Sequence, residues 1–295
     1  MARARILQPG ELEETRGAIE EYRLPESTLF AYREQRCRRL AREGNVLAVY
    51  LDFVACLAAA QHEGLMKTPL LPATGLEGAW LQNPSLVWAS LRRLGKAAAN
   101  LVAEQERDYF SSLPEREEPW FLVQAEALLA GRLPDVMPAT APLTAAALQL
   151  EWTRYVLEQA QAPPPRYQEA EVCPLCGGQP VAGVILAAGN ARGLRYLHCG
   201  LCGSSWHVVR SKCSHCGEGR DLGYFTLQGE MEHVRAEACG DCHSYIKVMY
   251  QQEEPELEPL ADDLATLALD LRMAEEGYVR SGMNPLFLPG PVTSP

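Results

Sequence analysis

The sequence has no excess of positive charge. Its 295 residues carry a formal net charge of −11 at pH 7, which argues against binding nucleic acid or anionic lipid through bulk electrostatics. It also shows no glycine-rich phosphate loop, no nucleophile motif and no pair of catalytic carboxylates in a convincing context. We therefore expect neither an enzyme nor a nucleic-acid-binding protein.

Long hydrophobic runs are also missing. The most apolar stretch, residues 46–60, is too short to span a bilayer and is interrupted by Asp52. Its apolar side chains, among them Val46, Val49 and Phe53, recur at helical spacing, so the stretch is predicted to be a buried helix. The beginning of the chain offers no apolar run that would serve as a signal peptide. We expect a cytoplasmic protein without stable membrane insertion.

The sequence divides into two unlike parts. Up to residue 162, apolar residues recur every three or four positions between clusters of Pro and Gly, which indicates an almost entirely helical region. The predicted helices cover residues 11–23, 27–43, 45–63, 84–105, 119–132 and 143–161. Three consecutive prolines at 163–165 cannot continue a helix and mark a predicted domain boundary.

Eight of the ten cysteines follow this boundary, and they form an internal repeat. Residues 172–210 align with residues 212–250 at an offset of 40, and each copy reads C-x2-C-x22-C-x2-C. The first copy contributes Cys173, Cys176, Cys199 and Cys202, which correspond to Cys213, Cys216, Cys239 and Cys242 in the second. The alignment also matches Gly177 with Gly217 and Ser204 with Ser244.

This spacing predicts two metal ions. A C-x2-C turn directs two thiolates at one ion, and two such turns supply the four soft ligands of a tetrahedral site. Within each copy, the runs 181–189 and 222–229 look like strands of a small hairpin. A disulfide framework is the alternative, but nothing else in the sequence points to an oxidising compartment.

The pattern leaves the pairing and the metal open. Tandem sites, each inside one copy, are favoured because a duplicated unit should bind metal as its ancestor did. The interleaved alternative joins Cys173 and Cys176 to Cys213 and Cys216. Thiolate ligands do not separate zinc from mononuclear iron. Four thiolates close each site, so the neighbouring histidines are not needed as ligands and metal-assisted hydrolysis is disfavoured.

The predicted fold is α+β and multidomain: an all-α domain, two tandem rubredoxin-like or zinc-ribbon-like β modules, and a C-terminal helix. The predicted domains are 1–165 for the helices, 166–210 and 211–252 for the two modules, and 253–295 for the C-terminal helix and tail. Each module has little core of its own, so metal binding should supply much of its folding free energy. The C-terminal helix should pack back on the body through one apolar face. That face comprises Leu260, Leu264, Leu267 and Leu271.

Four stretches of the C-terminal part carry a family resemblance. They are CPLCGG at 173, RYLHCGLCGSSWHVVRSKCSHCG at 195, CGDCHSYIKVMYQ at 239 and ADDLATLALDLRMAEEGYVRSGMNPLFLPG at 261. In these stretches the chain resembles the FdhE family of formate dehydrogenase accessory proteins. The N-terminal part offers weaker matches, such as YLDFVACLAAAQ at 50. None of the eight cysteines departs from the family pattern.

The resemblance implies a cytoplasmic protein with a helical domain and two rubredoxin-like domains. It implies that the eight cysteines listed above bind two metal ions, with iron favoured and zinc as the alternative. It further implies that the protein does not oxidise formate. Its partner would be the catalytic subunit of a membrane-associated formate dehydrogenase, which it would bind before export by the twin-arginine route and help to mature.

Two other functional classes are weighed against this one. A rubredoxin-like electron carrier would need iron with a reversible potential, yet most of the chain is helical domain rather than cofactor-binding module. A zinc-ribbon protein that binds nucleic acid would need a basic face. Residues 166–250 are instead charge-neutral, and residues 251–295 are acidic.

Overall fold

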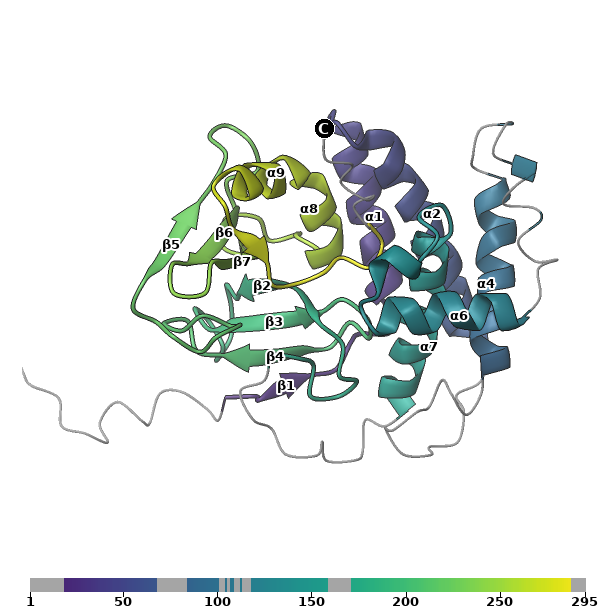
Figure 1. Ribbon diagram of the computed structural model, residues 1–295, viewed down its shortest axis with the longest axis horizontal. Helices are drawn as coiled ribbons and strands as arrows, with labels where there is room; N and C mark the ends of the chain where they lie inside the picture. The colour runs from purple at the N-terminus through teal and green to yellow at the C-terminus, as the bar shows by residue number, and fades with distance from the viewer. Residues whose placement is uncertain are drawn as a thin grey trace, which may run out of the picture.

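The part of the chain before the cysteine repeat is built from packed helices (Figure 1). The structure, a computed structural model, describes residues 19–67, 84–100, 104, 107–108, 112, 118–158 and 171–287. The long helices here are α1 (Leu29–Arg42), α2 (Ala48–Lys67), α4 (Pro84–Ala99), α6 (Glu118–Leu129) and α7 (Ala141–Glu158), and the 3-10 turn η3 (Leu133–Asp135) precedes α7. Each helix overlaps one predicted from the sequence. None in the described part is long and apolar enough to cross a membrane.

Helix α2 is buried as predicted, although two of the predicted side chains face solvent. Val54 and Leu57, both part of the predicted apolar face, are buried, as is Leu51, whereas Val46 and Val49 are 90% and 86% exposed. Val46 precedes the first residue of the helix, so helical periodicity does not apply to it. Val49 lies two positions before Leu51, which places it on the opposite side of the helix.

The two copies of the repeat form one continuous sheet. Its strands are β1 (Tyr22–Arg23), β2 (Pro180–Ile185), β3 (Arg195–Cys199), β4 (Ser205–Val208), β5 (Leu222–Phe225), β6 (Val234–Cys239), β7 (Ser244–Tyr250) and β8 (Val279–Arg280). The order is β1-β4-β3-β2-β7-β6-β5, with β8 paired to β7. Each copy supplies an antiparallel three-stranded unit, and the parallel pairing of β2 with β7 joins the two units, with Gly183 opposite Val248.

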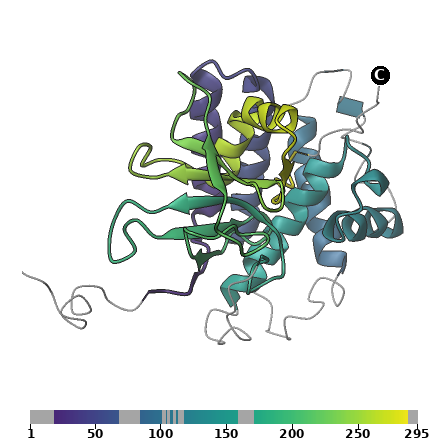
Figure 2. The same ribbon diagram turned by 60° about the vertical axis from the view of Figure 1, so that its left-hand side comes forward.

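The helices and the sheet share one core. Helix α8 (Pro259–Ala265) lies between the strands and α1 in both views (Figures 1 and 2). Apolar side chains of the sheet, such as Val184 and Met249, belong to the same buried cluster as Leu51 of α2 and Leu260 of α8. The fold class expected from the sequence is confirmed: helices, then a strand-rich region with two cysteine groups, then C-terminal helices.

Two expected helices differ from the structure. Residues 22 and 23, predicted to end a helix over 11–23, form strand β1 and pair with β4. The rest of that predicted helix up to residue 18, like the prolines at 163–165, lies outside the described residues. The Tyr22–Arg23 strand forms because β4 has a free edge whose backbone groups need partners.

The single C-terminal helix is in fact two. Helix α8 ends at Ala265 and α9 (Leu267–Glu275) follows, because the Thr266 hydroxyl donates hydrogen bonds to the carbonyls of Asp262 and Asp263 at 2.8 and 3.2 Å. Because of this break, α9 does not continue the buried face of α8. Leu260 and Leu264 are buried as predicted, whereas Leu271 is 63% exposed.

Candidate metal centres

The first group of cysteines is assembled by two turns. Cys173 and Cys176 lie in the turn that precedes β2, and Cys199 and Cys202 flank the turn between β3 and β4. Gly177 closes the first turn with φ of 73°, a conformation that costs glycine little. The backbone N–H groups of Gly178 and Leu201 then point at the sulfurs of Cys176 and Cys199, at 3.4 and 3.3 Å. The turns therefore position both the cysteine sulfurs and the backbone N–H groups that point at them.

The four sulfurs of this group lie within 4.8 Å of one another. The Sγ atoms of Cys173 and Cys202 are 3.7 Å apart, and those of Cys176 and Cys199 are 3.4 Å apart. Four sulfurs bound at about 2.3 Å around a tetrahedral metal would lie about 3.8 Å from each other. The donor set and its dimensions fit one metal ion.

The second group repeats this arrangement. The Sγ atoms of Cys213 and Cys242 are 3.8 Å apart, and those of Cys216 and Cys239 are 3.7 Å apart. The groups are thus tandem rather than interleaved, and none of the ten cysteines forms a disulfide. Neither group includes a histidine. Sequence reasoning therefore named all eight cysteines that the structure gathers.

The first group lies in the interior. Cys173, Cys199 and Cys202 are at most 2% exposed, and they share a buried cluster with Leu197 and Trp206. This burial follows from the parallel pairing of β2 with β7, which surrounds the first copy with strands on both sides.

Helix α7 holds one of the first group's turns directly. The Gln149 side-chain amide donates to the Gly200 carbonyl at 2.7 Å, and the Thr153 hydroxyl donates to the Cys202 carbonyl at 3.2 Å. Sequence reasoning missed both residues, because nothing in a helix distant along the chain signals which loop it will contact. These bonds couple the first group to the helical region.

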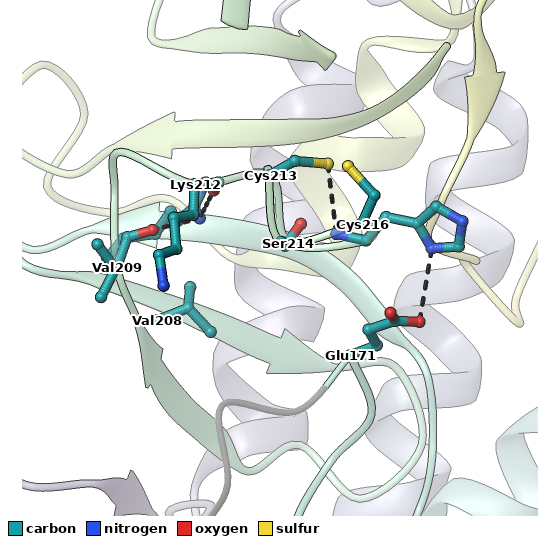
Figure 3. A pocket seen from close by; sticks show the side chains of 10 residues that line it. Glu171, Val208, Val209, Lys212, Cys213, Ser214 and Cys216 are labelled. Carbon is teal, nitrogen blue, oxygen red and sulfur yellow. Dashed lines mark hydrogen bonds and ion pairs between the residues drawn. The ribbon is translucent and has the colours of Figure 1, made fainter. Parts of the chain in front are cut away.

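The second group lies nearer the surface. Cys216 is exposed, and a cavity of about 180 Å³ opens beside it (Figure 3). Cys213, Ser214 and Lys212 line this cavity, and Glu171 approaches from the first copy, where its carboxylate lies 3.6 Å from His215. Solvent and small molecules therefore have access to the second group that they lack to the first.

A serine two residues after the last cysteine favours ionisation in each copy. Burial raises the pKa of Cys202, but hydrogen bonds with the other thiols and with Ser204 outweigh it and hold that pKa well below its usual range. Burial also raises the pKa of Cys242, yet the Ser244 hydroxyl, 3.0 Å from the sulfur, helps to lower it to about 7. The repeat alignment matches Ser204 with Ser244, and this match is the sequence signal that would have identified the two serines.

The neighbouring thiols hold the Cys176 thiol neutral. Hydrogen bonds with Cys173, Cys199 and Cys202, in that order of importance, raise the pKa of Cys176 well above its usual range. Thiolates crowded this closely repel one another unless a cation lies between them. The thiolate is also the form that binds metal. The repulsion between thiolates and the distances between the sulfur atoms therefore both favour a bound cation.

Comparison with known proteins identifies the family. The protein named "Protein FdhE homolog" of Serratia proteamaculans (strain 568) is 39% identical over 277 residues, 89% of each chain, and that of Yersinia pestis (strain Pestoides F) is 38% identical over the same length. This chain belongs to the FdhE family. FdhE models match along its length: the N-terminal model at residues 19–164, the central domain at 172–210 and the C-terminal domain at 211–287.

A solved FdhE structure has the same fold. The crystal structure of the FdhE protein from Pseudomonas aeruginosa superposes with a TM-score of 0.77 at 34% sequence identity, and the match covers 92% of this chain and 100% of that one. The family resemblance noted from the cysteine-rich stretches is therefore confirmed, and it extends over the helical region as well.

Proposed function

We propose that this chain is an accessory protein of formate dehydrogenase that binds the catalytic subunit in the cytoplasm before the subunit is exported by the twin-arginine route. Membership of the FdhE family supports an accessory role for formate dehydrogenase. In this proposal the chain does not oxidise formate. It recognises a client protein and contributes to its maturation.

The eight repeat cysteines are the proposed metal ligands, one ion for each group of four, with iron favoured and zinc as the alternative. A bound ion would cross-link the two turns of each copy and so stabilise both turns. The observation that carries this part is the pair of closed groups whose sulfur spacing fits a tetrahedral ion. A group with four protein ligands leaves no position for a substrate, which suits a structural role better than catalysis.

The client surface is proposed to depend on these ions. Around the first group, the hydrogen bonds of Gln149 and Thr153 make the position of α7 depend on the turn at Gly200. In the second copy, the segment between Cys213 and Cys239 contains β5, the turn of the β5–β6 hairpin and most of β6. Loss of metal would therefore loosen exposed strands that a client can reach.

Co-purification tests the proposal. The tagged protein is expected to recover the catalytic subunit of formate dehydrogenase under reducing, anaerobic conditions. The double variant Cys239→Ala, Cys242→Ala, whose group is not the buried one, is expected to recover much less. Cys56→Ala, which changes a partly exposed cysteine outside both groups, serves as the matched control and should behave as the unchanged protein does.

Two results would contradict the proposal in different ways. If the unchanged protein recovers no catalytic subunit, client binding is wrong. If the double variant is folded, lacks one metal ion and still recovers the subunit in full, the metal of the second copy has no part in binding. Metal analysis and a visible spectrum of the same preparation identify the ion, and zinc in both groups would exclude an electron carrier.

A further inference from the structure

One edge of the sheet is open in the described part of the chain. The strand order ends at β5, which pairs only with β6, whereas the opposite edge at β4 is covered by β1. Figure 1 shows β5 at the left of the molecule, away from α4, α6 and α7, and the turn to Figure 2 brings this side forward. The Tyr224 side chain on this strand is 50% exposed.

The first copy of the repeat shows what binds to the edge that corresponds to the open edge of β5. β2 is the strand of the first copy that corresponds to β5, and its outer edge is paired with β7 in parallel orientation. As a result every residue of β2 is buried, whereas none of β5 is. Among the described residues, the edge of β2 therefore has its partner strand in place, whereas the corresponding edge of β5 has none.

The backbone geometry of the two edges corresponds. Gly240 donates its N–H to the Asp221 carbonyl at 2.8 Å, and Gly200 donates likewise to Gln179 at 3.0 Å. Hydrogen-bonded and non-hydrogen-bonded pairs alternate along an antiparallel ladder. Asp221 belongs to a hydrogen-bonded pair, so Gly223 and Phe225, two and four residues later, also direct their N–H and C=O groups toward β6.

The outward groups of β5 are those of Leu222 and Tyr224, and Thr226, which directly follows the strand, continues the alternation. By their partners in the middle strand of each copy, β3 and β6, Tyr224 corresponds to Gly183. The same register carried one residue past β5 matches Thr226 with Ile185. The Ile185 carbonyl indeed faces the added strand, since it accepts from the N–H of Gln251 at 3.1 Å. Tyr224 and Thr226 therefore offer the donors and acceptors that receive a strand in the first copy.

The edge carries none of the features that usually block strand addition. Residues 222–226 include no proline, no lysine and no other charged residue, although exposed edges are commonly protected by such residues or by bulges. The segment around the strand is acidic: residues 218–241 contain six Asp and Glu against two Arg, and five of the six remain when Glu237, which is buried and paired with Arg195, is left out. An added strand with basic residues would complement this charge.

We propose that the open edge of β5 binds an extended segment of the client protein, which adds to the sheet parallel to β5 and carries basic residues. This inference rests on the proposed function for the identity of the client and deepens it by naming the surface. Main-chain hydrogen bonds to Tyr224 and Thr226 provide the affinity, as in other strand-addition complexes. The acidic surroundings select the charge of the segment.

A proline substitution tests the main-chain bonds. Tyr224→Pro removes an outward N–H without removing a bond to β6, and proline is tolerated on an edge strand. Tyr224→Ala removes the same side chain but keeps the N–H, so it is the matched control. Thr226→Pro and Thr226→Ala form a second pair in case the first proline variant does not fold, and metal content and thermal unfolding report on folding for all four.

Affinity is measured for the full-length protein with two probes: the catalytic subunit of formate dehydrogenase, and overlapping synthetic peptides that cover its sequence. The proline variants are expected to bind about tenfold more weakly than their alanine partners. Hydrogen exchange at Tyr224 and Thr226 should slow when either probe binds. Peptides that bind should be basic, and their binding should weaken as salt rises.

The outcomes separate this inference from the proposed function. If the subunit binds equally to proline and alanine variants, the β5 edge is not the surface, while client binding stands. If peptides bind through Tyr224 but the subunit does not, the edge is a peptide site and the proposed client is wrong. If the proline change instead dissolves a dimer, the occupant is a second copy of this chain and the inference is overturned. If neither probe binds, both ideas fail.

Discussion

The two copies of the repeat have the same ligand spacing but different surroundings. Three of the four cysteines of the first group are buried, and the group shares a cluster with Trp206 and is bonded to α7. The second group has one exposed cysteine and a cavity beside it. The comparison teaches that a local ligand pattern sets the geometry of a site but not its burial. Burial depends on what the rest of the chain packs against it.

The two copies are also attached to the helices in different ways. The first is attached through backbone carbonyls of its own turn, by neutral hydrogen bonds from α7. The second is attached through α8: the His233 ring lies 3.0 Å from Asp262, which in turn pairs with Arg36 of α1 at 2.6 Å. Glu258, which caps α8, also pairs with Arg33 of α1 at 3.0 Å. Burial raises the pKa of Asp262, but its hydrogen bonds with His233 and Arg36 outweigh burial and lower that pKa below its usual range.

The largest difference between the two copies is expected when cysteine ligands are removed from each group in turn. Cys199→Ala with Cys202→Ala is expected to abolish cooperative folding, because structural metal sites contribute on the order of 10 kcal/mol and this one lies in the shared core. Cys239→Ala with Cys242→Ala should leave a folded protein with one ion for each chain. Metal analysis and thermal unfolding by circular dichroism check both. Equal loss of folding in the two variants would show that burial does not distinguish the groups.

The buried ion pair between Arg36 of α1 and Asp262 of α8 is expected to have the next largest effect. Arg36→Ala leaves the buried carboxylate of Asp262 without its main partner and is expected to lower the free energy of unfolding by about 3–5 kcal/mol. Arg39→Ala on the same helix, where the pairs with Glu43 and Glu256 are exposed, should cost no more than about 1 kcal/mol. Denaturant unfolding measures both. Similar losses would mean that the buried pair does not attach α8 to the helices.

The bond from α7 to the first turn should have a smaller effect. Gln149→Leu leaves the Gly200 carbonyl without its donor and is expected to cost about 1–3 kcal/mol. It should also speed metal release from the first group while leaving the second unchanged. Gln124→Leu, in a polar contact with the backbone of Met137 far from both groups, controls for the loss of an amide. An unchanged release rate from the first group would show that α7 does not support it.

Metal release from the unmodified protein should show the smallest difference. A chelator is expected to remove the ion of the second group about tenfold faster than that of the first, a difference of about 1.4 kcal/mol in activation free energy. The exposed Cys216 and the adjacent cavity provide the reason. A colorimetric chelator in excess reports two phases, and the fast phase should be absent from the Cys239→Ala, Cys242→Ala variant. One phase, or a fast phase that survives in that variant, would refute the assignment.

Several elements could be predicted because their signals are local. The helices of the N-terminal region follow from apolar periodicity, and α4 begins at the predicted Pro84. The strands β2 and β5 fall within the apolar runs expected to form hairpins. The eight cysteines could be grouped because the repeat places equivalent residues at a constant offset. Each of these inferences needs only residues that are close in sequence or related by the repeat.

The errors have a common physical origin. Val46 and Val49 match a helical pattern, but the helix begins after the first and turns the second outward. Strand β1 has no pattern of its own and exists because the edge of β4 requires a partner. Leu271 fits the face of one long helix, yet the Thr266 hydroxyl ends that helix early. In each case a distant or competing contact outweighed the local preference.

The eight cysteines of the two groups could be named from the sequence alone, because a C-x2-C turn and its duplicate act over a few residues. The tertiary structure was needed to show that the groups are tandem rather than interleaved, which group is more buried and which charges meet in the core. Arg33 and Glu258, for example, are 225 residues apart. No short pattern encodes such a contact, because it depends on how the whole sheet and the helices pack together.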